Sequence, residues 1–573
     1  MTYWKGKIVH VDLRSESINI TWTEEKLIRS CLGGRGLGIK LLSELTDPRI
    51  DPLDPENPLI FTCGPLSGFA PMASGAVLTS KSPLTGTIFS WNAGGDFGKE
   101  LRKAEIYALV ITGKAKSPSY IEIRGEDTKI QSAKELWGKN INACTEALKS
   151  KGSVACIGRA GERKVLISSF GIDSIHGGRG GIGAVAGSKM LKAVVIKGEK
   201  EFLPVNPESF QALKAKVLRL LDASPMLSKG LANYGTSSFV KLLDYMHLIP
   251  SKNFSTTGTS FANLLSGEFI RASYELEKES CPACPLGCKK RIKETGQIIP
   301  DYDSLWAFGF NLENQDLTSV IKADQICKDY GLDPTSAGSV LGAYTELRSE
   351  IIKAHELESL LLDIGEGGEL GNGARKYLES RGRKELSMDV KGLELGGYDP
   401  RGIKGQALAY ATSNRGGDHL TAFMVGPEVL GKPVNLDRLS LKGKAGILQI
   451  FENLTAVLDS FVFCPFSIFA IDEVLCSSFI LSATGMEIPP GELLKIGERI
   501  WNLERIYNLK AGFTWRDDRL PERLFENEIE DENENKLSKK EFEAEVKEYY
   551  HYRGWEREGI PGHKKLKELE LSY

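Results

Sequence analysis

The stretch CPACPLGC, residues 281 to 288, places three cysteines within eight residues at a C-x2-C-x3-C spacing. Closely spaced cysteine thiolates bind soft metals and can hold one face of an iron–sulfur cluster. Zinc sites more often pair one C-x2-C with a second, distant pair of ligands, and no histidine lies nearby in the sequence to complete such a set. The spacing therefore favours an iron–sulfur cluster over zinc, with metal-free structural thiols as the third alternative.

A fourth cluster ligand has to come from another part of the chain. Cys464, in DSFVFCPF, precedes a proline in an apolar segment and is the best candidate, and Cys476 is its rival. The chain has 10 cysteines in 573 residues, too few for a disulfide scaffold. We expect the other five to be small buried hydrophobes: Cys31, Cys63, Cys144, Cys156 and Cys327.

The first 205 residues have the pattern of a mostly β domain. Glycine-rich turns separate short alternating or β-branched runs, which is typical of many short strands. The runs are KIVHVDL, SINITW, PLIFTCG, GAVLTS, YALVITG, SYIEIRG, KVLISSF and KAVVIKG.

After residue 205 the apolar residues recur at helical spacing, as in residues 209–223, 317–332, 336–367 and 491–512. Gly331 is a suitable C-terminal stop for the second of these helices. We therefore predict an α+β fold: a β-rich domain over 1–205, then mainly α-helical domains over 206–395 and 396–573. The acidic run near 525 is expected to be a solvated loop leading into a surface helix.

Composition excludes several classes of function. The formal charge is −3, and no lysine/arginine block suggests a nucleic-acid surface. The N-terminal MTYWKGKIVHVDL lacks the apolar centre of a signal peptide. The most apolar segment, 454–475, is interrupted by Asp459, Asp472 and Glu473, so we expect a buried core segment rather than a membrane span. The prediction is a cytoplasmic protein with no membrane and no nucleic-acid partner.

Three glycine-rich segments are predicted to be ligand-binding loops: CLGGRGLGIK (31–40), SWNAGGDFGKEL (90–101) and HGGRGGIGAVAGSKMLKAVVIKG (176–198). Glycine lets a backbone approach a ligand, and consecutive N–H groups can bind phosphate. A Rossmann fingerprint is not supported, because the third segment ends in a strand and has lysine where an acidic residue is expected. The loops favour a large anionic ligand, with simple tight turns as the alternative.

Eleven stretches together resemble the tungsten-containing aldehyde ferredoxin oxidoreductase family. They occur in that family's order across nearly the whole chain: LGGRGLG, GPLSG, KSPLTG, NAGGDFGKELRKA, GRGGIGAVAGSKMLKAVVIKG, CPACPLGC, PDYDSLWAFG, YGLDPTSAG, YDPRGIKGQALAYATSNRGGDHL, LDSFVFCPF and FTWRDDRLPERL.

The resemblance implies a tungsten (or molybdenum) ion held by the dithiolenes of two pterins, beside one [4Fe–4S] cluster. In that family a β domain carries the bis-pterin cofactor and two helical domains cover it. The implied cluster ligands are Cys281, Cys284, Cys288 and Cys464.

The glycine loops around Asn92 and at 176–178 resemble the family's sites for a magnesium ion that bridges the pterin phosphates. Asp333 in YGLD and Asp459 in DSFVFC match segments that contact the pterins, although Asp333 could equally cap the next helix. The cofactor-binding residues implied by the resemblance are Asn92, Ala93, Gly94, Gly95, His176, Gly177, Gly178, Arg179, Asp333, Asp459 and Phe463.

The implied activity is oxidation of a small aldehyde to a carboxylic acid, with electrons leaving through the cluster to ferredoxin or a similar one-electron acceptor. Asp303 in PDYD matches the general acid/base, and His419 in SNRGGDHL matches the hydrogen-bond donor to the substrate oxygen. Homodimers are common in the family. The alternative is a paralogue that does not oxidise aldehydes and serves as an electron-transfer or cofactor-bearing subunit of a larger complex.

Three positions depart from the family pattern. Ala76 stands at or near an arginine that bridges cluster and pterin, Asp303 replaces a glutamate, and Val462-Phe463 replaces a glycine–leucine pair. Loss of a multi-donor cation should change the cluster's potential. A shorter acid should enlarge the substrate pocket or alter the activity.

Overall fold

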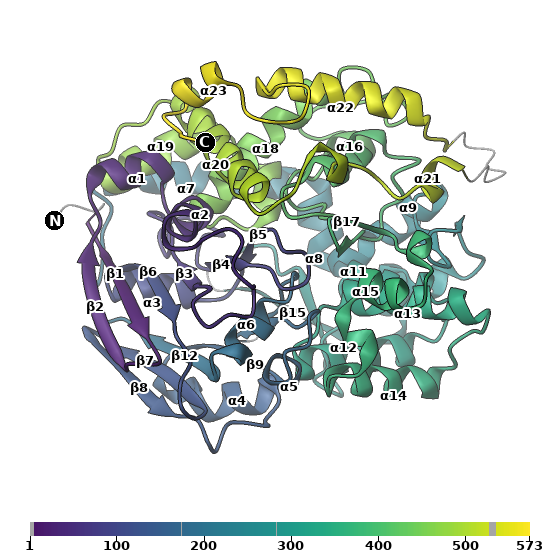
Figure 1. Cartoon of the computed structure of the whole chain (residues 1–573), viewed down its shortest axis with the longest axis horizontal. Coiled ribbons are helices and arrows are strands. Elements are labelled where there is room, and N and C mark those ends of the chain that lie inside the picture. The colour runs from purple at the N-terminus through teal and green to yellow at the C-terminus, as the bar shows by residue number, and fades with distance from the viewer. Residues whose placement is uncertain (1–4, 174, 282–283, 527–534) are drawn as a thin grey trace.

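The computed structural model describes residues 5–173, 175–281, 284–526 and 535–573, and these residues form a mixed α/β protein (Figure 1). Strands are concentrated in the first 197 residues, and helices dominate from residue 207 onward. The predicted order of a β-rich N-terminal region followed by mainly helical regions is therefore confirmed. The boundary between the two helical domains, at 395/396, stays a prediction.

The first sheet of the N-terminal region has six strands in the order β2-β1-β6-β3-β4-β5. Strands β1 and β6 pair in parallel, and the other neighbours pair antiparallel. Strands β3 and β4 are buried along their whole length, as expected for the middle of a covered sheet. The bounds are β1 Lys7–Asp12, β2 Ser17–Trp22, β3 Leu59–Thr62, β4 Ala76–Lys81, β5 Ile88–Ala93 and β6 Ile106–Thr112.

The second sheet also has six strands, in the order β11-β10-β9-β12-β7-β8. Figure 1 shows it below the first sheet in the same N-terminal region. The predicted strand KVLISSF is wrong for most of its length, because residues 164–169 form turns and only Phe170 belongs to a strand. The bounds are β7 Ser119–Arg124, β8 Asp127–Ser132, β9 Ser153–Ile157, β10 Phe170–Ile172, β11 Ile175–Gly177 and β12 Leu191–Lys197.

The first glycine-rich segment is a helix rather than the predicted loop. Residues 34–45 form α2 (Gly34–Leu45). A Cβ atom on Gly36 would lie 2.1 Å from the carbonyl oxygen of Cys31, and one on Gly38 would lie 2.3 Å from Oγ1 of Thr79. The glycines therefore allow the helix to pack closely on its neighbours, a use that the sequence pattern does not distinguish from loop formation.

The other two glycine-rich segments are loops for only part of their length. Residues 94–96 connect β5 to α3 (Phe97–Lys103), and residues 178–181 connect β11 to α6 (Ile182–Ser188). Gly95, Gly178, Gly180 and Gly181 have φ angles of +95°, +97°, +72° and +74°, which favour glycine.

The predicted helices are present, and their ends follow capping rules. Asn206 caps α7 by accepting a hydrogen bond from the Ser209 N–H at 3.0 Å. Helix α12 ends at Gly331 in the left-handed conformation, as predicted. The predicted helix over 336–367 is two helices, broken at 349–353. The bounds are α7 Pro207–Ala223, α12 Leu317–Tyr330, α13 Pro334–Arg348, α14 Ala354–Gly365, α16 Lys404–Thr412, α19 Glu473–Thr484 and α22 Lys539–Arg553.

The C-terminal helices are held against the N-terminal region by α2. Helix α18 (Lys444–Ser460) packs on α20 (Pro490–Lys510), and both contact α2, as Figure 1 shows above the first sheet. The buried Arg35 of α2 donates two hydrogen bonds of 2.8 Å to Glu504 of α20. A bidentate pair of this kind fixes orientation as well as contact, so it sets how the two regions meet.

The segment 454–475 is buried in the core, as predicted, only over its first half: residues 455–463 are buried, whereas most of 464–474 are half-buried or exposed. It contains the end of α18 and a short turn at Pro465–Phe469. Among the described residues, no helix is both long and apolar enough to cross a membrane. Residues 527–534 of the predicted acidic loop lie outside the described residues.

Candidate functional site

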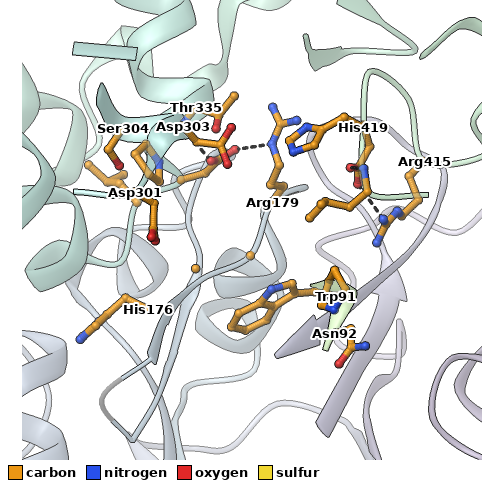
Figure 2. A pocket seen from close by; sticks show the side chains of 18 of the residues that line it. Trp91, Asn92, His176, Arg179, Asp301, Asp303, Ser304, Thr335, Arg415 and His419 are labelled. Atoms are coloured by element: carbon orange, nitrogen blue, oxygen red, sulfur yellow. Dashed lines mark hydrogen bonds and ion pairs between the residues drawn. The ribbon is translucent and has the colours of Figure 1, made fainter. Parts of the chain in front are cut away.

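A cavity with about 990 Å³ of empty volume lies where the two regions of the chain meet. Its wall is drawn from segments far apart in sequence, and Figure 2 shows their side chains surrounding it. They are the end of β5 at 91–92, the turn 176–179, residues 301–304, the start of α13 at 333–335, residues 415–420, Asp459 and Pro465.

Asp303 and His419, the two predicted catalytic residues, line this same cavity. Burial raises the pKa of Asp303, while His419 and Arg179 act in the opposite direction. Among the described residues, Oδ1 of Asp303 and Nδ1 of His419 are buried without a hydrogen-bond partner. The structure therefore brings a carboxyl group and an imidazole, 116 positions apart in the chain, to one cavity. Each of the two groups keeps one atom that is free to form a further hydrogen bond.

The imidazole of His419 is held by aromatic rings. The Tyr398 ring centroid lies 5.0 Å from it and that of Phe423 lies 6.0 Å away. Space for the imidazole exists because residue 396 is glycine: a Cβ atom there would lie 2.9 Å from Nδ1 of His419. Packing of this kind fixes the direction in which the imidazole can present a proton.

Arg179 lies in the middle of the cavity wall, between Asp303 and His419 in Figure 2. Its Nε donates to Asp333 at 2.9 Å, and its Nη2 donates to the carbonyl oxygen of Glu394 at 2.8 Å. Asp333 also caps α13, accepting from the Thr335 N–H at 3.0 Å. The capping interpretation of Asp333 is therefore confirmed, and its contact with a pterin stays a prediction.

Glu394 is a member of this network that the sequence analysis missed. Its carboxylate accepts a hydrogen bond from Ser336 Oγ at 2.7 Å and from the Ala374 N–H at 3.0 Å. Burial raises the pKa of Glu394 to about 7, although Arg179 opposes the shift. No motif marks this residue: it lies in the short strand β18 (Leu393–Glu394), and only the fold places it behind Arg179.

Asn92 and Asp459 connect the first sheet to α18. Nδ2 of Asn92 donates to Asp459 at 2.9 Å and to the carbonyl oxygen of Phe463 at 2.8 Å. Asp459 also accepts from Arg35 at 3.3 Å. The Phe463 ring packs in the core against Phe461, so the contribution of this residue to the contact is its backbone carbonyl.

The two remaining glycine turns, 92–95 and 176–179, lie side by side. A Cβ atom on Gly94 would lie 3.7 Å from Ile175, and one on Gly178 would lie 3.0 Å from the Trp91 ring. Burial, with the nearby Lys328 and Lys289, lowers the pKa of His176 to about 3. Ala76, which departs from the family pattern, pairs with Ala93 in the β4–β5 ladder, at the edge of this site.

Three of the cysteines lie in the turn of a hairpin formed by β15 (Leu276–Glu279) and β16 (Lys289–Ile292). Cys464 approaches from the other helical region, and its N–H donates to the carbonyl oxygen of Met72 at 2.9 Å. Burial raises the pKa of Cys464, and Cys288, Cys284 and Cys281 add to the shift. Cys464 therefore lies within electrostatic range of the other three thiols.

The rival candidate Cys476 lies elsewhere, in α19. Burial raises its pKa too, but the charged groups that contribute are Asp472 and Glu473 rather than other cysteines. In the described ranges, no three His, Cys, Asp or Glu side chains are arranged around a single-ion site. A set of four thiols is the usual donor set of a [4Fe–4S] cluster.

Two sequence models of one protein family match the chain. The model of the aldehyde ferredoxin oxidoreductase N-terminal domain matches residues 8–198, and that of its domains 2 and 3 matches residues 212–571. This chain belongs to the aldehyde ferredoxin oxidoreductase family. The protein is therefore an oxidoreductase, and the predicted resemblance is confirmed.

Several relatives match nearly the whole length of the chain. The tungsten-containing aldehyde ferredoxin oxidoreductase of Pyrococcus furiosus is 38% identical over 598 residues, covering 99% of each chain. The protein of the same name from Thermococcus kodakarensis is 36% identical over 599 residues, again covering 99% of each. The aliphatic sulfonate oxidoreductase, WOR-like subunit, of P. furiosus is 27% identical over 636 residues, covering 100% of this chain and 97% of its own.

A solved structure has the same fold. The active-site complex BamBC of benzoyl coenzyme A reductase, determined with 1,5-dienoyl-CoA, contains a chain with a TM-score of 0.83 and 22% sequence identity. The match covers 100% of this chain and 98% of the other. At this identity the likeness shows the aldehyde ferredoxin oxidoreductase fold alone.

Family membership implies a tungsten–pterin cofactor and a ferredoxin-type acceptor, and the cavity residues suit a polar ligand. Four residues that line it each have a buried polar atom without a hydrogen-bond partner, counted among the described residues: Asp303 Oδ1, His176 Nδ1, His419 Nδ1 and Arg415 Nε. The two histidine atoms lie near Gly171 and Gly396. Buried polar atoms are normally hydrogen-bonded, so unpaired ones around a cavity indicate a missing partner. Arg415 was not assigned from sequence, although it lies in the quoted SNRGGDHL stretch.

Proposed function

We propose that this protein oxidises aldehydes to carboxylic acids and passes the electrons to ferredoxin or a similar one-electron acceptor. The overall reaction takes one aldehyde and one water and yields one carboxylic acid, two protons and two electrons. When bound, a bis-pterin tungsten (or molybdenum) centre supplies the two-electron oxidation, and a [4Fe–4S] cluster supplies one-electron transfer. The chain's own residues bind and orient the aldehyde and accept or donate protons.

The observation that carries the proposal is that Asp303 and His419 line one cavity with unpaired buried polar atoms. His419, packed against Tyr398 and Phe423, is placed to donate a hydrogen bond to the aldehyde oxygen and so polarise the carbonyl. Asp303 is placed to accept a proton at its carboxylate. Its raised pKa makes the carboxyl a better base than a solvated aspartate.

The cofactors are assigned to residues as follows. Cys281, Cys284, Cys288 and Cys464 would hold the cluster, and the turns 92–95 and 176–179 would face the pterin phosphates with the bridging Mg²⁺. The proximity of the four thiols supports the first assignment. The positive φ angles of Gly95 and Gly178, which let the backbone approach a ligand, support the second. A homodimer is the proposed assembly, by likeness to the family.

Metal analysis and a dye assay test the proposal. Anaerobically purified protein should contain about four irons and one tungsten or molybdenum per chain, and zinc alone would contradict it. Viologen reduction with a panel of aliphatic and aromatic aldehydes then tests the activity. Asp303→Asn should lower that rate by roughly a hundredfold or more, the usual contribution of a general acid/base, with metal content unchanged.

A specific observation supports a second candidate function. By the resemblance, Asp303 replaces a glutamate of the family and Ala76 stands at or near the position of an arginine. Ala76 pairs with Ala93 beside the glycine turn that follows β5. Two of the more distant relatives are named as parts of larger assemblies. In this alternative the protein carries the cofactors within a complex and does not oxidise aldehydes. Fully metallated protein that reduces no viologen with any aldehyde would favour it, and gain of activity in Asp303→Glu would trace the difference to this one residue.

A further inference from the structure

A second cavity, with about 590 Å³ of empty volume, lies beside the hairpin that carries the three clustered cysteines. One wall is the β15–β16 hairpin, and the other is formed by residues 232–233 and the end of α10 (Gly267–Ser273). Three of its lining residues are cationic, Arg271, Lys278 and Lys290, and one is acidic, Glu275, so the lining has a net positive charge. Arg271 and Lys278 are exposed, whereas Lys290 is buried, so the cavity is a cationic depression that opens to the surface.

The cations face one another across the hairpin. Lys278 and Lys290 are direct partners in the antiparallel register of β15 and β16. Like charges placed directly opposite in a sheet are destabilising. The flanking pairs of the same ladder have opposite charges, Glu279 with Lys289 and Glu277 with Arg291. The repulsive pair is therefore the exception in an otherwise complementary hairpin.

Among the described residues, the acidic side chains of the hairpin that form ion pairs do so with other cations. Glu279 pairs with Arg291 at 2.5 Å, and Glu275 is in close contact with Lys293. The Lys290 ammonium donates a hydrogen bond to the carbonyl oxygen of Gly287. This neutral acceptor does not cancel the positive charge of the ammonium. Within the described residues, no ion pair joins a carboxylate to any of the three cations.

The cavity lies close to a proposed cluster ligand, Cys288. Asn233 lines it, and a Cβ atom on Gly235, two positions later, would lie 2.7 Å from the carbonyl oxygen of Cys288. Lys290 follows Cys288 by two positions and lies on the same hairpin. A partner that inserted an anionic group here would therefore contact the hairpin that carries the thiols, two positions from Cys288.

We propose that the cavity lined by Arg271, Lys278 and Lys290 is the docking point for an acidic one-electron carrier protein. The proposal rests on the proposed function, because that function gives the electrons a place to go. The molecule as a whole carries a formal charge of −3, so an acidic carrier is weakly repelled except where local charge is positive. A cationic depression both steers such a partner and fixes its orientation. Carboxylates of the carrier would supply the counter-charges that the hairpin lacks.

Charge reversal tests the docking point against a matched control. The variant Arg271→Glu/Lys278→Glu removes the two exposed cations and leaves the buried Lys290 in place. The control Lys114→Glu/Lys116→Glu changes the net charge equally at two exposed lysines of the N-terminal region. The probe is a purified acidic [4Fe–4S] ferredoxin, whose binding is measured at about 50 mM and about 300 mM salt, because screening weakens steering.

The expected result is roughly tenfold weaker ferredoxin binding in Arg271→Glu/Lys278→Glu at the lower salt, shrinking at the higher salt, with less than a twofold change in the control. In turnover the KM for ferredoxin should rise while kcat changes little. Equal weakening in both variants, or none in either, would overturn the docking point. Wild-type protein that binds ferredoxin but reduces no viologen with any aldehyde would count against the proposed function alone.

Discussion

Nε of Arg179 donates a hydrogen bond of 2.9 Å to Oδ2 of Asp333, and this contact ties the glycine turn of the β domain to the first turn of α13. The arginine is nearly buried, with 13% of its side chain exposed, and the aspartate has 3% exposed. Removing one partner of a buried ion pair leaves an uncompensated charge, which is more costly than losing the pair as a whole. The cavity wall therefore depends on both residues being present.

Arg179→Met should lower the free energy of unfolding by about 3 kcal/mol, the lower end of the range for breaking a buried pair. Urea denaturation followed by circular dichroism measures the change. Arg348→Met is the control, since Arg348 forms an exposed pair with Glu350 and such pairs contribute little. An Arg179→Met protein as stable as the control would show that the pair is not the element holding the turn.

Glu394 predicts a dependence of stability on pH. Its folded pKa of about 7 lies above the ordinary value of 4.5, so the folded protein retains a proton that the unfolded chain has lost between those two values. Stability from this group therefore falls as pH rises through that window, by about 3 kcal/mol in total. Glu394→Gln should remove the slope. Urea midpoints from about pH 4 to about pH 8 measure it, and parallel curves for wild type and variant would contradict the assignment.

The sequence was sufficient for the order of a β-rich region followed by mainly helical regions, because strand and helix spacing are local patterns. Alternation marked β1 and β7, and helical spacing marked α7 and α20. Prediction from sequence failed where one residue type serves two structural purposes. The glycines of α2 allow close packing, yet in sequence they look like those of a ligand loop. Glu394 and Arg35 could not be found, because only tertiary contacts give them roles.

The choice between Cys464 and Cys476 as the fourth cluster ligand can be decided by paired variants. Cys464→Ser should reduce the iron content well below four per chain and abolish the signal of a reduced [4Fe–4S] cluster in electron paramagnetic resonance. Cys476→Ser should retain both, because Cys476 lies in α19 with acidic rather than thiol neighbours. Iron loss in Cys476→Ser alone would reverse the assignment.

Gly94 provides a test of the cluster site that alters no cysteine. A Cβ atom there would lie 3.0 Å from Sγ of Cys281, a tight contact that a free thiol could relieve by rotating away. A thiolate fixed on a cluster cannot rotate, so Gly94→Ala should lower iron occupancy or shift the resonance of the reduced cluster, while the folded content of metal-free protein stays near wild type. Gly491→Ala is the control, because a Cβ atom at that position meets nothing within 4 Å. Unchanged iron content and an unchanged spectrum in Gly94→Ala would mean that Cys281 is free to move and does not hold the cluster.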